Sequence, residues 1–143
     1  MKASLRSCRS SLLISAALLL GVALAVAVGV IPPARTDTFP LATPERAVPA
    51  FWVNFVFNLT AAAILGLIAI RIRWRSHLST SVLVLLAIFI LLFTLALVDA
   101  AFAYRSHGPS MQTATTLLFF CGISDFLAAL LVIATAVRFP KRT

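Results

Sequence analysis

The stretch SVLVLLAIFILLFTLALVDAAFAY, residues 81–104, decides the fold class of this chain, because Asp99 is its only charged side chain. At ~1.5 Å per residue, an α-helix over this stretch would be ~36 Å long, which exceeds the ~30 Å hydrocarbon core of a bilayer. The stretch therefore predicts a membrane-spanning helix.

Three further apolar runs of similar length flank this stretch. Hydrophobic residues make up 62% of the chain and charged residues only 11%, which is far from the usual composition of a soluble domain. We predict an all-α fold, an integral membrane four-helix up-down bundle that forms one domain over residues 1–143. The predicted spans are about 11–31, 50–70, 81–104 and 113–137.

The segments between the predicted spans are short. Residues 71–80 and 105–112 leave little chain for a crossing, so helices that are neighbours in sequence are expected to run antiparallel. Residues 32–49 contain five prolines, which favour an extended, restrained path. None of these segments is long enough for a soluble domain that could hold an active site.

The basic amino-terminal segment followed by an apolar run also resembles a secretory signal peptide. The run 11–31 is longer than a typical signal core, and its Ala23-Leu24-Ala25 pattern lies within apolar sequence. We therefore expect this segment to be retained as the first span.

The basic residues predict the orientation of the chain. The formal net charge is +8, and nine Lys and Arg residues fall on one side of the predicted spans against three on the other. Because an excess of Lys and Arg marks the cytoplasmic face, both termini are predicted to be cytoplasmic. Basic residues clustered beside apolar runs, without a separate basic face, argue against nucleic-acid binding. The nine are Lys2, Arg6, Arg9, Arg71, Arg73, Arg75, Arg138, Lys141 and Arg142.

Small residues recur every fourth position in the first predicted span, which aligns them on one helix face. They are Ala17, Gly21, Ala25 and Gly29, and such a ridge lets another helix approach closely. We expect that helix to belong to the same chain, with a different subunit as the alternative.

The second predicted span places Asn54, Asn58, Ala62 and Gly66 on one face by the same spacing. Amides that face lipid would lack partners, so this stripe is predicted to face inward. Hydrogen bonding between helices is the preferred interpretation of the two asparagines.

Asp99 and Asp125 are the only charged side chains within the predicted spans, where ionisable groups are costly. Asp99 lies about one turn from the outer end of its span. Asp125 lies near the midplane, on a face with Cys121 and Ala129, and no Lys, Arg or His shares its depth. We expect Asp125 to be neutral and hydrogen-bonded, or else to meet a charge on another subunit. A structural polar contact is the preferred role for both acids, with a proton or ion pathway as the alternative.

The remaining reactive side chains form no recognisable site. Cys8 is predicted to be cytoplasmic and Cys121 to lie in the membrane, so they are too far apart for a disulfide. His77 and His107 fall on opposite sides of the membrane and cannot share a metal ion. We therefore predict no metal site, no cofactor and no catalytic residue.

The layout resembles that of MARVEL-type four-span proteins, on account of its short cytoplasmic ends, modest first outer segment, tight inner segment and acidic Asp99 in the third span. The resemblance implies a membrane-organising role. Related plant four-span proteins pair that acid with a basic residue in the first span, whereas residues 11–31 contain none.

Three classes of function remain. The preferred one is a non-enzymatic membrane-organising scaffold or an accessory subunit of a membrane complex. Its expected partners are the lipid bilayer and either another membrane protein or a second copy of the chain. The alternatives are a small proton- or ion-coupled transporter component centred on Asp99 and Asp125, and a compact membrane enzyme acting on a hydrophobic substrate.

Overall fold

The computed structural model describes residues 2–31, 44–71, 77–105 and 112–138. These residues form helices and no strand, which confirms the all-α prediction. The first helix continues into a short π-helical segment. The elements are α1 (Lys2–Ala25), η1 (Val26–Val30), α3 (Pro44–Ile70), α4 (His77–Arg105) and α5 (Gln112–Arg138).

Each of the four long helices contains an apolar segment long enough to cross a membrane. The predicted spans overlap all four segments. By length and hydropathy the described part of the chain therefore has four candidate membrane spans, as the sequence predicts. They are Arg6–Val30, Val48–Ile70, Thr80–Arg105 and Gln112–Arg138.

The helix α3 begins earlier than the sequence predicts. An extended path is expected up to Pro49, whereas α3 begins at Pro44 and contains Pro49. Proline is accommodated at the start of a helix because the first four backbone N–H groups have no intrahelical partner. Pro44 occupies such a position, and Pro49 removes only one bond close to the helix start. The expectation is therefore wrong for residues 44–49, and residues 32–43 lie outside the described residues.

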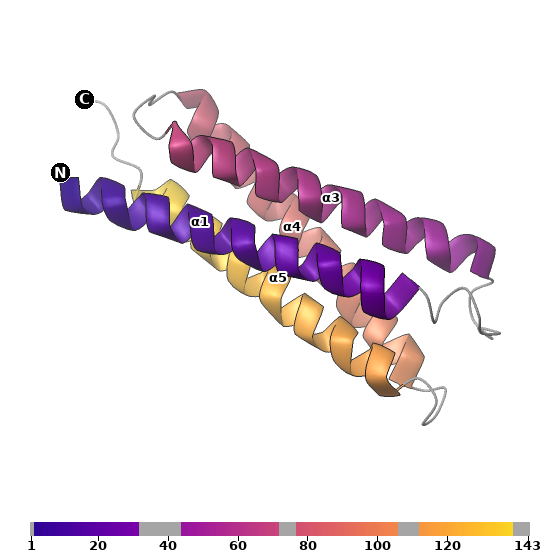
Figure 1. The fold of residues 1–143 in the computed structure, drawn as a ribbon. Coiled ribbons are helices and arrows are strands. Elements are labelled where there is room, and N and C mark those ends of the chain that lie inside the picture. The colour runs from indigo at the N-terminus through magenta and orange to yellow at the C-terminus, as the bar shows by residue number, and fades with distance from the viewer. Residues whose placement is uncertain (1, 32–43, 72–76, 106–111, 139–143) are drawn as a thin grey trace.

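The four long helices lie side by side, and the start of α1 and the end of α5 lie at the same end of the molecule (Figure 1). α1 packs along α3, α4 packs along α5, and α1 also packs along α5. Contact between α3 and α4 is much smaller, and a stack of Phe57 on Phe93 contributes to it, with ring centroids 4.2 Å apart. The molecule thus consists of two helix pairs, α1/α3 and α4/α5, joined through α1 and α5.

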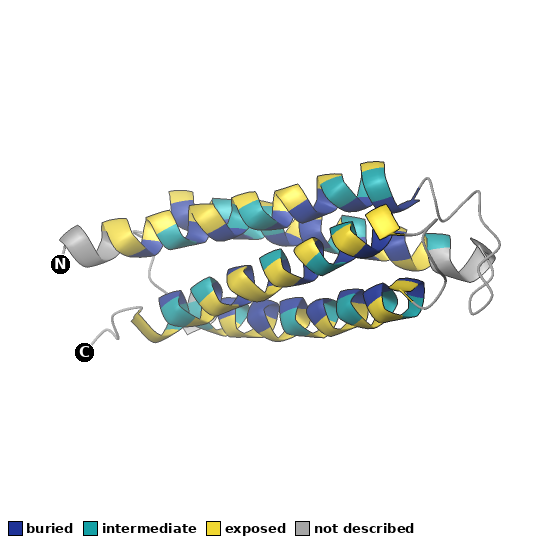
Figure 2. Cartoon of the chain, turned by 90° about the horizontal axis from the view of Figure 1, so that it is seen from below, coloured by how far each residue is buried: buried dark blue, intermediate teal, exposed yellow. Residues whose placement is uncertain are grey.

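The helix interfaces are mainly apolar, and so is much of the outer surface. Leu12 and Leu65 belong to one buried cluster, and Val26 and Leu118 belong to another. Buried and exposed residues recur along each helix, so each helix turns one face inward (Figure 2). Large apolar side chains are also exposed, such as Val137 at 80%. An outer surface of this kind is suited to contact with lipid or with other apolar helices.

Gly122 sets how closely α4 and α5 approach each other. A Cβ atom at Gly122 would lie 3.0 Å from Cγ2 of Val98 on α4, which is tighter than an ordinary contact. At Gly66 of α3, a Cβ atom would meet nothing within 4 Å. A small residue is therefore needed at Gly122 and not at Gly66.

We expect Gly122→Leu to destabilise the folded protein by about 1–3 kcal/mol, because overpacking displaces neighbouring side chains and backbone. Gly66→Leu is the matched control and should not destabilise the protein by more than about 0.5 kcal/mol, since its surroundings are open. The measurement is the free energy of unfolding of each purified variant in detergent. Equal losses in the two variants would contradict the role assigned to Gly122.

Candidate functional site

Asp125 lies half-way along α5 and is fully buried. Cys121, four residues before it, and Ala129, four residues after it, are buried on the same helix. Buried positions on α5 recur at three- and four-residue intervals, which matches the helical repeat, so α5 turns one continuous face toward the other helices. The carboxyl group therefore lies inside the bundle.

Two asparagines of α3 form a hydrogen-bonded pair in the interior. Asn54 is 4% exposed and Asn58 is 0% exposed. The Nδ2 atom of Asn58 donates to Asn54 Oδ1 at 2.9 Å and to the backbone oxygen of Asn54 at 3.1 Å. These contacts hold the Asn58 amide in place, while Asn58 Oδ1 has no hydrogen-bond partner.

The Asn58 amide of α3 approaches the Asp125 carboxyl of α5 closely enough to interact with it. The approach falls short of a well-formed hydrogen bond, because both carboxyl oxygens of Asp125 are buried without a partner. The Cys121 thiol, one turn away on α5, also lies within electrostatic range of Asp125. We call Asn54, Asn58, Cys121 and Asp125 the polar cluster.

The polar cluster supplies amide groups, one thiol and one ionisable carboxyl. An amide and a carboxyl can exchange hydrogen bonds, and the carboxyl can hold or release a proton. Nucleophilic catalysis would need a base beside the thiol, oriented by a third group, and the cluster contains no such pair. Among the described residues, no three His, Cys, Asp or Glu side chains gather into a candidate metal site.

Asp99 lies apart from the polar cluster. It is exposed on α4, six residues before the end of that helix at Arg105, which corresponds to ~9 Å along the axis. Asp125 is thirteen residues from either end of α5, or ~20 Å. The structure does not bring the two acids to one site.

The small residues of α1 lie mostly away from the interior. Ala17 and Gly21 are exposed, and Ala25 and Gly29 are half-buried. A Cβ atom at Gly29 would clash with the Leu117 side chain of α5. The internal partner expected for the whole ridge is therefore wrong at Ala17 and Gly21. Larger side chains occupy the inward face of α1 instead; they include Leu12, Leu19 and Val22.

The stripe on α3 turns away from the interior after Asn58. Ala62 and Gly66 are only half-buried, and the buried face continues through Ala61 and Leu65. Four residues turn an α-helix by ~400°, so a strict four-residue spacing drifts by ~40° at each step. Steps of three and four residues in alternation stay on one face, as the buried residues of α3 do.

Buried hydroxyl groups that the sequence analysis does not single out include those of Ser15, Thr94 and Thr135. Each donates to the backbone carbonyl four residues earlier in its own helix, at 2.8 to 2.9 Å. Because these bonds are local, the hydroxyls form no site between helices. Their position on the inward face of each helix is the signal that could have identified them.

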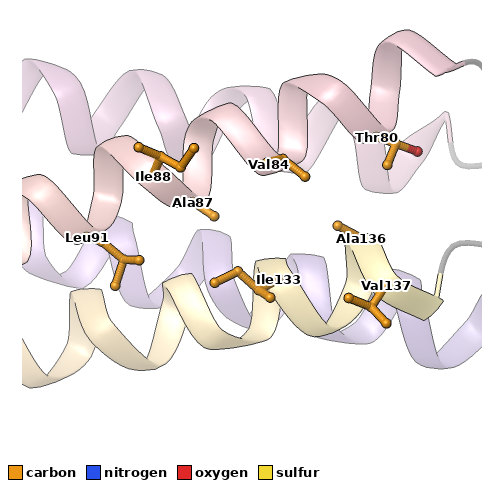
Figure 3. A pocket seen from close by; sticks show the side chains of 8 residues that line it. All are labelled: Thr80, Val84, Ala87, Ile88, Leu91, Ile133, Ala136 and Val137. Atoms are coloured by element: carbon orange, nitrogen blue, oxygen red, sulfur yellow. The ribbon is translucent and has the colours of Figure 1, made fainter.

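A groove of about 340 Å³ lies between α4 and α5, lined by side chains from both helices (Figure 3). Its lining is apolar except for the Thr80 hydroxyl at one end. A second groove of about 410 Å³ lies beside Trp52, Phe57 and Phe93 of α3 and α4. No member of the polar cluster lines either groove, so neither gives a solute access to Asp125.

No known protein family, curated protein or solved structure matches this chain. The roles of Asn58 and Asp125 therefore follow from their own chemistry and surroundings.

Asn58→Ala should destabilise the protein by about 1 kcal/mol, because side-chain hydrogen bonds in membrane bundles average ~0.6 kcal/mol and Asn58 donates two to Asn54. Thr60→Ala is the control, since the exposed Thr60 hydroxyl donates a hydrogen bond to the backbone carbonyl of Val56 in its own helix. It should change the free energy of unfolding by less than about 0.5 kcal/mol. A loss in Thr60→Ala as large as that in Asn58→Ala would argue against a special role for the asparagine pair.

Proposed function

We propose that this chain is an integral membrane protein whose four spans form an up-down bundle, with both termini in the cytoplasm. It acts there as a non-enzymatic membrane-organising scaffold or as an accessory subunit of a membrane complex. Within this proposed role, the layout of the spans favours a MARVEL-like membrane-organising function. The four candidate spans, the position of the start of α1 and the end of α5 at the same end of the molecule in Figure 1 and the excess of basic residues on one side support the proposal.

The observation that carries this proposal is the separation of the polar cluster from the outer surface. Asn58 and Asp125 are fully buried, while both described grooves are apolar and open outward. A transporter needs an accessible ion site, and an enzyme needs a pocket with placed polar groups. The described surface instead presents apolar faces, which suit lipid and other membrane helices.

The outward face of α1 around Gly21 is the surface that we propose for a partner helix. Ala17 and Gly21 are exposed, and a Cβ atom at Gly21 would meet nothing within 4 Å. Leu20 and Leu24 on the same side of α1 are 43% and 57% exposed. Small residues between large apolar ones let the backbone of another transmembrane helix approach closely. This face therefore fits a membrane span of another subunit.

The double substitution Ala17→Leu with Gly21→Leu should reduce cross-linking of the chain to its partner in native membranes by about tenfold or more. The added side chains would keep the two helix backbones apart. The control is Ala96→Leu, which enlarges a small exposed residue of α4 away from this face. Undiminished cross-linking in the folded double variant would reject the α1 face. A chain without any partner in native membranes would reject the accessory-subunit role.

The proposed orientation has its own test. An Asn-X-Ser/Thr acceptor site engineered within residues 32–49 should be glycosylated, because the proposal places this segment outside the cytoplasm. An acceptor site added after Thr143 should remain unmodified. The opposite pattern, read from the gel mobility of each variant, would overturn the orientation.

A proton- or ion-coupled transporter component is the second candidate function. One observation favours it, namely that both Asp125 oxygens are buried without a partner. Flux through proteoliposomes that contain the Asp125→Asn variant separates the two candidates. Lost flux with intact assembly would support transport, whereas lost assembly alone would support the scaffold.

A further inference from the structure

Three buried oxygen atoms of the polar cluster lack a hydrogen-bond donor: Asn58 Oδ1 and both carboxyl oxygens of Asp125. The buried hydroxyls of Ser15 and Thr94, by contrast, are satisfied within their own helices. Buried polar atoms without partners are destabilising, so each one needs a physical explanation. These three atoms belong to two side chains that approach each other from α3 and α5.

An ionised Asp125 would have no counterion within the described bundle. The helix segments around it contain no basic residue and only three other titratable groups. Cys121 lies beside it, while Asp99 and Tyr104 lie in the last two turns of α4, and none of these is positively charged. A buried carboxylate without a partner is strongly unfavourable. The segments without a basic residue are 10–31, 48–70, 80–104 and 112–137.

A protonated carboxyl group is chemically complementary to an asparagine amide. The acid O–H can donate to the amide oxygen, and the acid C=O can accept from the amide N–H. An ionised carboxyl has no hydrogen to donate, so Asn58 Oδ1 would stay unpaired. A single proton on Asp125 therefore removes the buried charge and supplies the missing donor.

We infer that Asp125 binds a proton in the folded protein and donates it to Asn58 Oδ1. Asn54 is a positioning residue, because its two oxygens accept from Asn58 Nδ2 and hold the amide in place. The acid–amide pair joins α5 to α3, which belong to different helix pairs. This inference goes beyond the proposed function and requires the burial of these side chains and their approach to each other. Failure to find a partner subunit would therefore leave it untouched.

Infrared difference spectroscopy of the purified protein at neutral pH tests the protonation. The chain has only four Asp and Glu residues, so the difference between wild type and Asp125→Asn isolates this carboxyl. We expect the wild type to show the C=O stretching band of a protonated acid, which Asp125→Asn loses and the control Asp99→Asn keeps. A carboxylate band lost in Asp125→Asn, or one that responds to sodium, would overturn the inference.

The same spectra test the assignment of Asn58 as the acceptor. In Asn58→Leu the acid O–H loses its acceptor, so the C=O band of Asp125 should move in the direction of weaker hydrogen bonding. Thr60→Ala, which alters an exposed residue of α3, should leave the band in place. An unmoved band in Asn58→Leu would reject the pairing.

Thermal unfolding in detergent gives an independent readout. Asp125→Asn can donate to Asn58 Oδ1 without a charge and should keep the Tm within ~2 °C of wild type, whereas Asp125→Leu leaves that oxygen unpaired and should lower it by ~4 °C or more. The exchanged pair, Asn58→Asp with Asp125→Asn, should recover most of the Tm that Asn58→Asp alone loses. Equal Tm values for Asp125→Asn and Asp125→Leu would overturn the inference.

The pH dependence of the Tm completes the test. If Asp125 is protonated in the folded protein and ionised in the unfolded chain, the folded state binds more protons and stability falls as pH rises. The Tm of wild type should therefore decrease from pH 5 to pH 8 by more than that of Asp125→Asn. Identical slopes for the two proteins would contradict proton uptake at Asp125.

Discussion

The packing of α1 against α5 is the contact on which the rest of the bundle depends. α1 and α3 form one closely packed pair and α4 and α5 form the other, while α3 and α4 share much less surface. Without the α1/α5 contact the two pairs would be held together mainly by aromatic side chains such as Phe57 and Phe93. The segment η1 lies in this contact and packs on both α3 and α5. Gly29 within η1 lies beside the Leu117 side chain of α5, which would have to move if Gly29 carried a side chain.

Polar side chains determine which face of each helix lies inside, because hydrophobicity alone does not distinguish the faces. On α3 the exposed Leu67 and the buried Leu65 are equally apolar. If lipid surrounds the helices, there is little gain in burying one rather than the other, whereas an amide or a carboxyl would gain a partner only inside. Hydroxyls such as that of Thr94 are satisfied by their own helix and exert no such preference. The asparagines and Asp125 are therefore the groups that specify the interior.

The same reasoning explains how much of the structure could be predicted from the sequence. The four long helices follow from the length of the apolar runs, and the inward position of Asn58 and Asp125 agrees with the polarity argument. The outward position of Ala17 and Gly21 could not be predicted, because small residues fit a close internal contact and an exposed face equally well. Short segments between successive spans also suggest that each helix packs on both of its neighbours in the sequence. Instead, α3 makes little contact with α4, and α1 packs on α5. The approach of the Asn58 side chain to Asp125 depends on which helices pack together. A single sequence does not contain this information.

The surroundings of Asp125 favour a structural role over conduction. A proton relay needs a continuous series of exchanging groups, but the buried hydroxyls of Ser15, Thr94 and Thr135 bond to their own helix backbones. Asp99 is exposed on another helix, nearer its end. Neither described groove reaches the polar cluster. A proton held between Asn58 and Asp125 would lie in the buried interior, without a described groove that leads to it. Such a buried acid–amide pair would contribute to the structure of the bundle, whereas a step in transport would need further exchanging groups beside it.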